Sequence, residues 1–214
     1  MKKFFSEDNI IFSALSYLGD LILLNALFLL CCLPVITVGS SMTAAFRVAS
    51  KLVDRSCGHI SKEFLSALRS NFRQSTPPWL LALFIYALLP LYYAMSAGGE
   101  NALMGYWLAG SFVIALFVSA VLCYLFPLIS RYENDLLTHI KNAALLAVLN
   151  LPRTLVMMAM SLFPAALLIL YPGLFFYLIP VWLLFGFSVI INMNAAVLRP
   201  VLKKLDEGAD GEGE

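Results

Sequence analysis

The feature that most constrains this chain is a set of five long apolar stretches that carry almost no charge. None of them contains Lys or Arg, and Asp20 is the only acidic residue in any of them. A helix needs about 20 mostly apolar residues to cross a hydrocarbon core about 30 Å thick. The sequence therefore predicts an all-α fold, a polytopic transmembrane helical bundle with about five spans. The expected spans are residues 10–38, 79–97, 106–130, 154–171 and 174–197.

The composition agrees with a membrane protein. Hydrophobic residues make up 61% of the 214 residues, charged residues only 13%, and the mean hydropathy is +0.87, whereas a soluble domain has roughly 25% charged residues. The net charge of +1 gives no reason to expect a nucleic-acid partner. The four cysteines form no CxxC pair and three lie in apolar stretches, so neither a disulfide framework nor a zinc site is expected.

The distribution of the 14 basic residues predicts the orientation. Two precede the first span, six lie between the first and second, none in the second connection, three in the third, none in the fourth, and three after the last span. Under the positive-inside rule this alternation places residues 39–78, residues 131–153 and the C-terminus in the cytoplasm. It also leaves Lys2 and Lys3 outside, unless the first segment is re-entrant.

The first stretch is longer than one crossing requires. If Gly19-Asp20 divides it, residues 4–18 form a helix in the outer interface, residues 21–38 form the crossing, and Asp20 caps that crossing. In a continuous helix Asp20 would instead lie near the bilayer centre, where an ionisable residue costs at least about 2.5 kcal/mol and points to function. Both alternatives remain open from the sequence.

Two basic amphipathic helices are expected between the first and second spans. Apolar residues recur at three- and four-residue steps over residues 42–53, and a second helix begins at Ser61 and extends to about Phe72, before Pro77 and Pro78. Residues 131–153 repeat this style and end at Asn150-Leu151-Pro152. Such helices either lie on the anionic inner leaflet, dock on a partner protein, or cover the inner ends of the bundle.

No arrangement of residues predicts chemistry. The two histidines, His59 and His139, lack a second ligand at metal-binding spacing, and no serine has a GxSxG context. We therefore expect no catalytic, cofactor-binding or metal-binding residues, and a protein that is not an enzyme. Inside the spans the polar residues of note are Asp20, Asn25, Asn192 and Asn194. Asn192 and Asn194 face different sides of their helix, and at least one of them is expected to form an interhelical hydrogen bond.

The stretch from Leu33 to Ser41 closes the first apolar run and opens the most basic segment. Pro34 is expected to loosen the helix, Gly39 to allow a backbone conformation that other residues resist, and Ser40 or Ser41 to cap the helix that follows. We interpret this stretch as a structural elbow rather than a binding site.

The chain resembles the YesL-like family of small bacterial membrane proteins, a domain of unknown function. The resemblance rests on Leu33-Pro34-Val35-Ile36-Thr37-Val38-Gly39 with Ala44 and Ala45, on Phe64, Asn71-Phe72-Arg73-Gln74-Ser75 and Trp79-Leu80, and on Leu151-Pro152-Arg153-Thr154. It extends to about Leu202. The resemblance implies a multi-pass protein of the bacterial cytoplasmic membrane, often encoded beside carbohydrate ABC importers, and it assigns no catalytic residue.

These observations lead to two hypotheses for a single membrane domain over residues 1–202, followed by an acidic disordered tail over residues 203–214. The first is a non-enzymatic accessory component of carbohydrate (oligosaccharide) uptake, with the lipid bilayer and ABC-type sugar importer subunits as partners. The alternative is a transporter or channel subunit that acts in its own right, alone or through self-association. The candidate residues for function or interaction are Asp20, Pro34, Thr37, Gly39, Arg47, Asn71, Arg73, Pro152 and Arg153.

Overall fold

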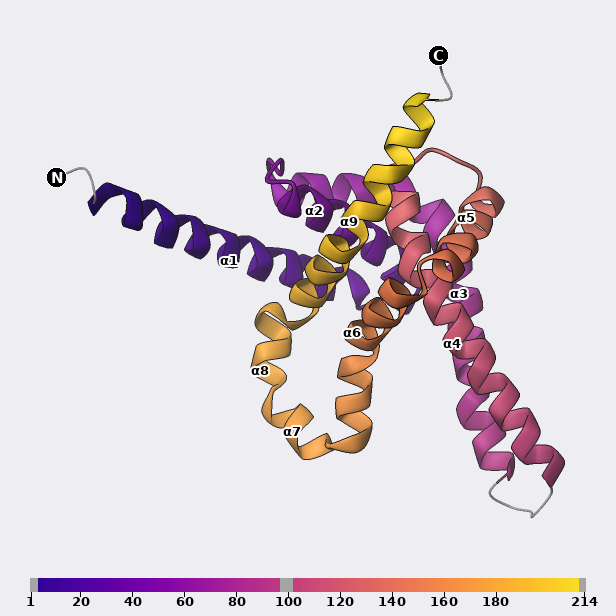
Figure 1. Cartoon of the computed structure of the whole chain (residues 1–214). Helices are drawn as coiled ribbons and strands as arrows, with labels where there is room; N and C mark the ends of the chain where they lie inside the picture. The colour runs from indigo at the N-terminus through magenta and orange to yellow at the C-terminus, as the bar shows by residue number, and fades with distance from the viewer. Residues whose placement is uncertain (1–3, 97–101, 212–214) are drawn as a thin grey trace.

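The computed structural model describes residues 4–96 and 102–211, and within these ranges every regular element is helical (Figure 1). The elements are α1 (Phe4–Cys32), the 3-10 turn η1 (Val35–Thr37), α2 (Val38–Val53), α3 (Ile60–Ser96), α4 (Ala102–Arg131), α5 (Leu136–Leu149), α6 (Leu151–Leu170), α7 (Pro172–Tyr177), α8 (Ile179–Val181), the π-helical turn η2 (Trp182–Gly186) and α9 (Phe187–Gly211). Five segments of the described chain are long and apolar enough to cross a membrane: Ser13–Cys32, Ile60–Leu91, Ala109–Arg131, Leu151–Leu170 and Ile179–Glu207. The prediction of an all-α polytopic bundle is confirmed.

Helix α2 is the centre of the molecule rather than a surface helix. Ten of its 16 residues are buried, and α1, α3, α4 and α9 pack around it. Small side chains such as Ala44 and Ala45 let these neighbours approach closely. Its contacts with these four helices give α2 an internal packing role.

Helix α3 corrects the prediction of a separate second amphipathic helix. It runs unbroken for 37 residues through Pro77, Pro78 and Pro90, although each proline removes a backbone donor. At 1.5 Å per residue it is about 55 Å long, more than a hydrocarbon core of about 30 Å requires. Its polar first half is therefore continuous with the apolar second half in one helix.

The first segment follows the continuous-helix alternative through Gly19 and Asp20, but the helix ends at Cys32. Helix α1 is continuous through Gly19 and Asp20, so Asp20 caps no helix. The helix ends at Cys32, because Pro34 cannot continue it and Leu33 is held in a less regular conformation before a proline. The predicted span of residues 10–38 is thus an α-helix, a turn at residues 33–37, and the first residue of α2.

The fifth span is a broken helix that Asn25 of α1 holds in place. After α6 ends, the chain forms α7, α8 and η2 before the regular helix α9 begins. The Asn25 amide donates hydrogen bonds to the carbonyls of Trp182 (3.0 Å) and Leu183 (2.7 Å), and its oxygen accepts one from the backbone N–H of Ser188 (3.0 Å). Asn25 is fully buried. It therefore pairs carbonyls that the π-helical turn would otherwise leave unsatisfied in an apolar environment.

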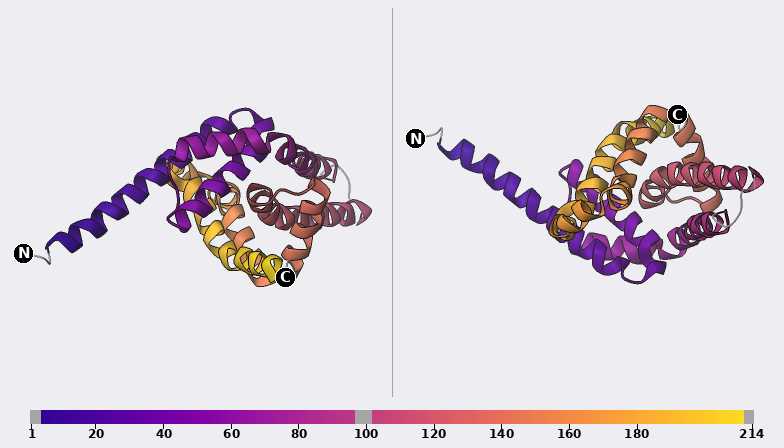
Figure 2. Two further views of the ribbon diagram at one scale, coloured as in Figure 1. Left: turned by 90° about the horizontal axis from the view of Figure 1, so that it is seen from above. Right: turned by 90° about the horizontal axis from the view of Figure 1, so that it is seen from below.

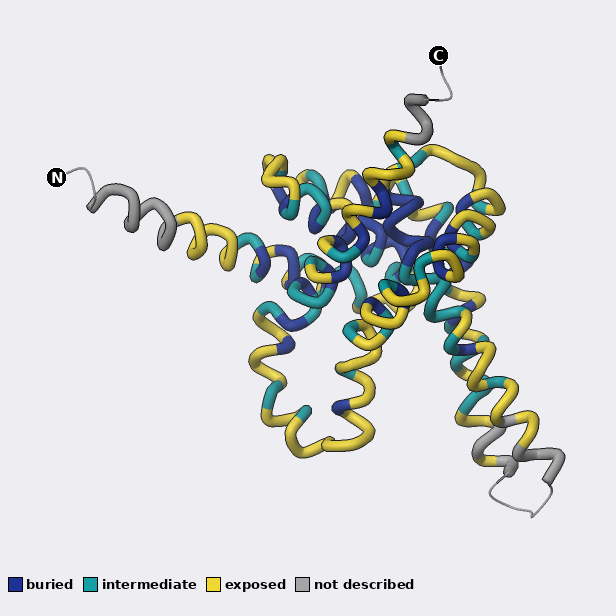
Figure 3. The backbone as a smooth tube through the Cα atoms, viewed as in Figure 1, coloured by how far each residue is buried: buried dark blue, intermediate teal, exposed yellow. Residues whose placement is uncertain are grey.

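Burial is concentrated where the helices cross α2, and it falls off along the legs formed by α3 with α4 and by α6 with α7 and α8 (Figure 3). The lower ends of these legs carry exposed apolar residues such as Leu91, Ile169 and Tyr177. Asn194 of α9 donates to Ser161 of α6 (2.9 Å) and Tyr17 of α1 donates to Asn192 of α9 (2.7 Å), so the interhelical hydrogen bond expected for at least one of these asparagines is confirmed and is made by both. Helix α9 continues to Gly211, which corrects the expectation of a disordered tail from residue 203.

Candidate functional site

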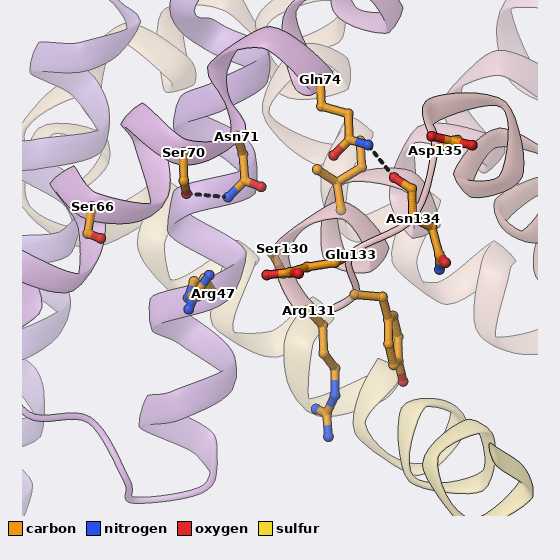
Figure 4. A pocket seen from close by; sticks show the side chains of 12 residues that line it. Arg47, Ser66, Ser70, Asn71, Gln74, Ser130, Arg131, Glu133, Asn134 and Asp135 are labelled. Carbon is orange, nitrogen blue, oxygen red and sulfur yellow. Dashed lines mark hydrogen bonds between the residues drawn. The ribbon is translucent and has the colours of Figure 1, made fainter. Parts of the chain in front are cut away.

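A polar cleft lies where α2, the first half of α3 and the end of α4 meet (Figure 4). Its volume is about 840 Å³, near the upper end of the roughly 300–1,000 Å³ typical of ligand sites. The lining residues are Arg47, Ser66, Ser70, Asn71, Gln74, Ile129, Ser130, Arg131, Tyr132, Glu133, Asn134 and Asp135. The cleft lies between the two basic regions, residues 39–78 and residues 131–153, that we expect on the same side of the membrane.

The α3 wall follows from helical spacing. Ser66, Ser70 and Gln74 recur every four residues, so they lie on one face of α3. The Asn71 amide donates to the carbonyl of Ala67 (2.9 Å) and to the hydroxyl of Ser70 (3.2 Å). Gln74 reaches across and donates to the carbonyl of Asn134, which ties α3 to the connection between α4 and α5. This wall is thus a fixed row of amides and hydroxyls.

The charged groups of the cleft are divided between its two sides. Arg47 is exposed and forms no ion pair with any described residue. Glu133 and Asp135 are exposed on the opposite side and are also unpaired within the described chain. In contrast, Lys51 pairs with Glu63 at 2.7 Å. The cleft therefore offers both a free cation and free carboxylates to whatever enters it.

The floor of the cleft is tied to α9 through one carboxylate. Arg131 forms an ion pair with Asp206 (Nη2 to Oδ2, 2.5 Å), and the Tyr132 hydroxyl donates to the other oxygen of Asp206 at 2.6 Å. Burial and then the Asp206 carboxylate raise the pKa of Tyr132 to about 12. The phenol consequently remains a hydrogen-bond donor at any physiological pH, and the end of α4 stays attached to α9.

A second hollow of about 490 Å³ lies among the spans, and apolar side chains form most of its lining. Residues from α1, α2, α3, α4, α6 and α9 surround it, including Phe28, Trp79, Leu122 and Ile191. A helix with its side chains is about 10–12 Å across, so this volume would hold only about one helical turn. No three His, Cys, Asp or Glu side chains of the described chain are placed to share a metal ion there or elsewhere.

The cleft brings together two of the nine candidate residues, Arg47 and Asn71. Asp20 lies elsewhere, in the middle of α1 and near Cys57 of the α2–α3 connection. Burial chiefly, and then the Glu63 and Asp20 carboxylates, raise the pKa of the Cys57 thiol. Asp20 is thus level with that connection.

Three further candidates, Pro34, Thr37 and Gly39, form the elbow. The Thr37 hydroxyl bonds to the carbonyls of Pro34 (2.6 Å) and Cys31. Gly39 is helical without a positive φ, so the prediction of a special backbone conformation is wrong. A Cβ there would lie 2.5 Å from the Ser75 carbonyl oxygen and 2.7 Å from Trp79 Cβ. The glycine permits close packing of α2 on α3.

The cap predicted at Ser40 or Ser41 is absent, because Ser40 donates back to the Thr37 carbonyl (2.9 Å).

The remaining candidates lie outside the cleft. Arg73 is exposed on α3, and Arg153 donates to the Asn150 side chain (3.3 Å) where α6 begins, next to Pro152 in its first turn.

Sequence reasoning missed most of the cleft. The four-residue repeat of Ser66, Ser70 and Gln74 was a usable signal for one wall. The other wall, from Ile129 to Asp135, combines the end of an apolar span with an irregular connection. Its approach to α3 depends on how the helices pack, which no local pattern records.

Fold and cleft together define an all-helical polytopic membrane protein with a polar site at one end. Residues 21–93, about a third of the chain, match a family model described as "Protein of unknown function, DUF624". The match covers the second half of α1, the elbow, α2 and most of α3, and therefore one wall of the cleft. Searches of curated proteins and of solved structures found no match.

Proposed function

We propose that this protein is a non-enzymatic accessory component of a membrane assembly, and that the polar cleft receives a polypeptide segment of the partner. The observation that carries this proposal is that Arg47 lies across a cleft of about 840 Å³ from Glu133 and Asp135, and that none of the three forms an ion pair within the described residues. A peptide segment supplies backbone donors and acceptors as well as charges of both signs. The rows of amides and hydroxyls on α3 are suited to such a segment.

We infer the kind of partner from the resemblance of Leu33–Gly39, Asn71–Ser75 and Leu151–Thr154 to the YesL-like family. The family model that matches residues 21–93 is of unknown function and names no partner. We propose a subunit of an ABC-type carbohydrate importer in a bacterial cytoplasmic membrane as the partner. Under the positive-inside rule, the basic residues within 39–78 and 131–153 support a cytoplasmic location for the end of the molecule that holds the cleft and for the C-terminus. The partner segment is then a cytoplasmic loop of the importer.

Charge reversal in the cleft tests this function. Arg47→Glu should abolish co-purification of importer subunits in mild detergent, because it places a third carboxylate opposite Glu133 and Asp135. The matched control is Arg69→Glu, which makes the same charge change at an exposed α3 residue that does not line the cleft. Recovery of the unmodified protein alone, or equal recovery of importer subunits with both variants, would contradict the proposal.

A further inference from the structure

Helices α1 and α2 form a hairpin. The start of α1 and the end of α2 lie at the same end of the molecule. Figure 1 shows α1 starting at the level of the α2–α3 connection and descending to the middle of the molecule, where α2 turns back upward. Both views of Figure 2 show α1 extending outward, away from the bundle formed by the other helices. The lower ends of α3 and α7 lie at the opposite end (Figure 1).

The placement of Asp20 agrees with this, since its carboxylate lies within electrostatic range of the Cys57 thiol. The Asp20 carboxylate acts on the Cys57 thiol, which follows the end of α2. Twelve residues separate Asp20 from the end of α1 at Cys32. The second half of α1 therefore descends beside α2, and Asp20 lies near the cleft end rather than at mid-depth.

Backbone polar groups in the turn of the hairpin, residues 33–37, form hydrogen bonds. Thr37 N–H donates to the Pro34 carbonyl (3.0 Å), and the Thr37 carbonyl accepts from the Ser40 hydroxyl (2.9 Å). The Val35 carbonyl accepts from the Trp79 indole N–H at 2.8 Å. Irregular backbone is tolerated at membrane depth only where such partners replace water.

The side chains at the tip of this turn are apolar and uncovered. Leu33, Val35 and Ile36 are 77%, 53% and 54% exposed. A contiguous apolar patch with satisfied backbone groups suits hydrocarbon and not water.

We propose that α1 and α2 form a re-entrant hairpin, which enters the bilayer from the cleft side, inserts Leu33, Val35 and Ile36 among the lipid acyl chains at mid-depth, and returns to the cleft side. The remaining spans, in α3, α4, α6 and α7–α9, cross fully. The start of α1 then shares a side with the cleft and with the end of α9. The first half of α1 extends along the interface on that side.

Cysteine accessibility tests this proposal without reference to which side is cytoplasmic. Three proteins each keep one cysteine: Ser6→Cys near the start of α1, the native Cys57, and Gly173→Cys in the turn after α6, where an added Cβ meets no atom within 4 Å. A membrane-impermeant maleimide is applied to sealed cells at mildly alkaline pH. Ser6→Cys should react under the same conditions as Cys57 and opposite to Gly173→Cys. Reaction of Ser6→Cys together with Gly173→Cys would overturn the proposal.

A second variant tests the depth of the tip independently of the first. Ile36 is more than half exposed in the fold, so the fold itself does not protect Ile36→Cys from the maleimide, and protection requires surrounding lipid or another chain. The variant should stay unlabelled in both sealed and permeabilised membranes and become labelled after denaturation in SDS. Labelling in permeabilised membranes would place the turn in water. Protection accompanied by a covalent dimer after oxidation would place a second copy of the chain there, and either result contradicts insertion into lipid.

Discussion

At the scale of single residues, the fold depends on a few positions where backbone atoms of two helices meet. Gly39 lets α2 lie directly on the Ser75 carbonyl of α3, and the hydroxyls of Thr43 and Ser75 are hydrogen-bonded beside it at 2.8 Å. Asn25 makes the equivalent connection between α1 and the broken fifth span. Asn25 hydrogen-bonds to the backbone of a neighbouring element, and Gly39 leaves room for the backbone of a neighbouring helix. This explains why an amide and a small residue occur in otherwise apolar helices.

Gly39→Ala should destabilise the protein by about 1–3 kcal/mol, because the new methyl group must displace backbone rather than a flexible side chain. Thermal unfolding in detergent measures the effect. Gly19→Ala is the matched control, since no atom lies within 4 Å of its added Cβ, and it should stabilise α1 by up to about 1 kcal/mol. An unchanged midpoint for Gly39→Ala would show that α2 and α3 are not packed this closely.

Asn25→Leu should cost about 1–3 kcal/mol, because three hydrogen bonds are lost and the Trp182 and Leu183 carbonyls remain unpaired in an apolar environment. Unfolding in increasing SDS compares it with Asn142→Leu, an exposed asparagine of α5, which should change stability by less than about 0.5 kcal/mol. Equal effects of the two substitutions would contradict the role of Asn25 in holding η2.

At the scale of elements, helices that looked equivalent in the sequence have different environments. The sequence predicts amphipathic inner-face helices for the segments of both α2 and α5. In the structure α2 has ten buried residues, whereas α5 has four. His139 is one of those four. Burial lowers the pKa of His139, against an opposing hydrogen bond with the backbone of Tyr132, so α5 packs against the end of α4 with a neutral imidazole.

This environment makes stability depend on pH. Because the pKa of His139 is lowered in the fold, the unfolded chain binds a proton more readily than the folded protein does. The contribution of the neutral imidazole to the free energy of unfolding is therefore complete above about pH 6.5. It is lost as the pH falls through the pKa that His139 has in the folded protein. The thermal midpoint in detergent should therefore fall on acidification. His139→Leu should reduce this fall, while His59→Leu, at an exposed position, should leave it unchanged. An identical pH profile for the His139 variant would contradict a neutral buried imidazole.

At the scale of the whole molecule, the sequence predicts which segments are helical and apolar but not how they are arranged. Charge-free apolar runs correctly indicated five candidate spans, because membrane insertion depends on local composition. The continuity of α3 through Pro77 and Pro78 was missed, because proline is a local signal that tertiary packing overrides. Arg47 and Asn71 were identified as single residues, whereas their meeting with Glu133 and Asp135 depends on the burial of α2 between distant helices.

Site-specific photo-cross-linking in intact membranes tests the central claim that the cleft holds a polypeptide segment. A photoreactive amino acid at Ser70, inside the cleft, should form an adduct with an importer subunit. The same group at Leu137, an exposed residue of α5 that does not line the cleft, should form none. Arg47→Glu should abolish the Ser70 adduct and Arg69→Glu should preserve it. An adduct from Ser70 with lipid only, or none at all, would contradict the proposed function of the cleft.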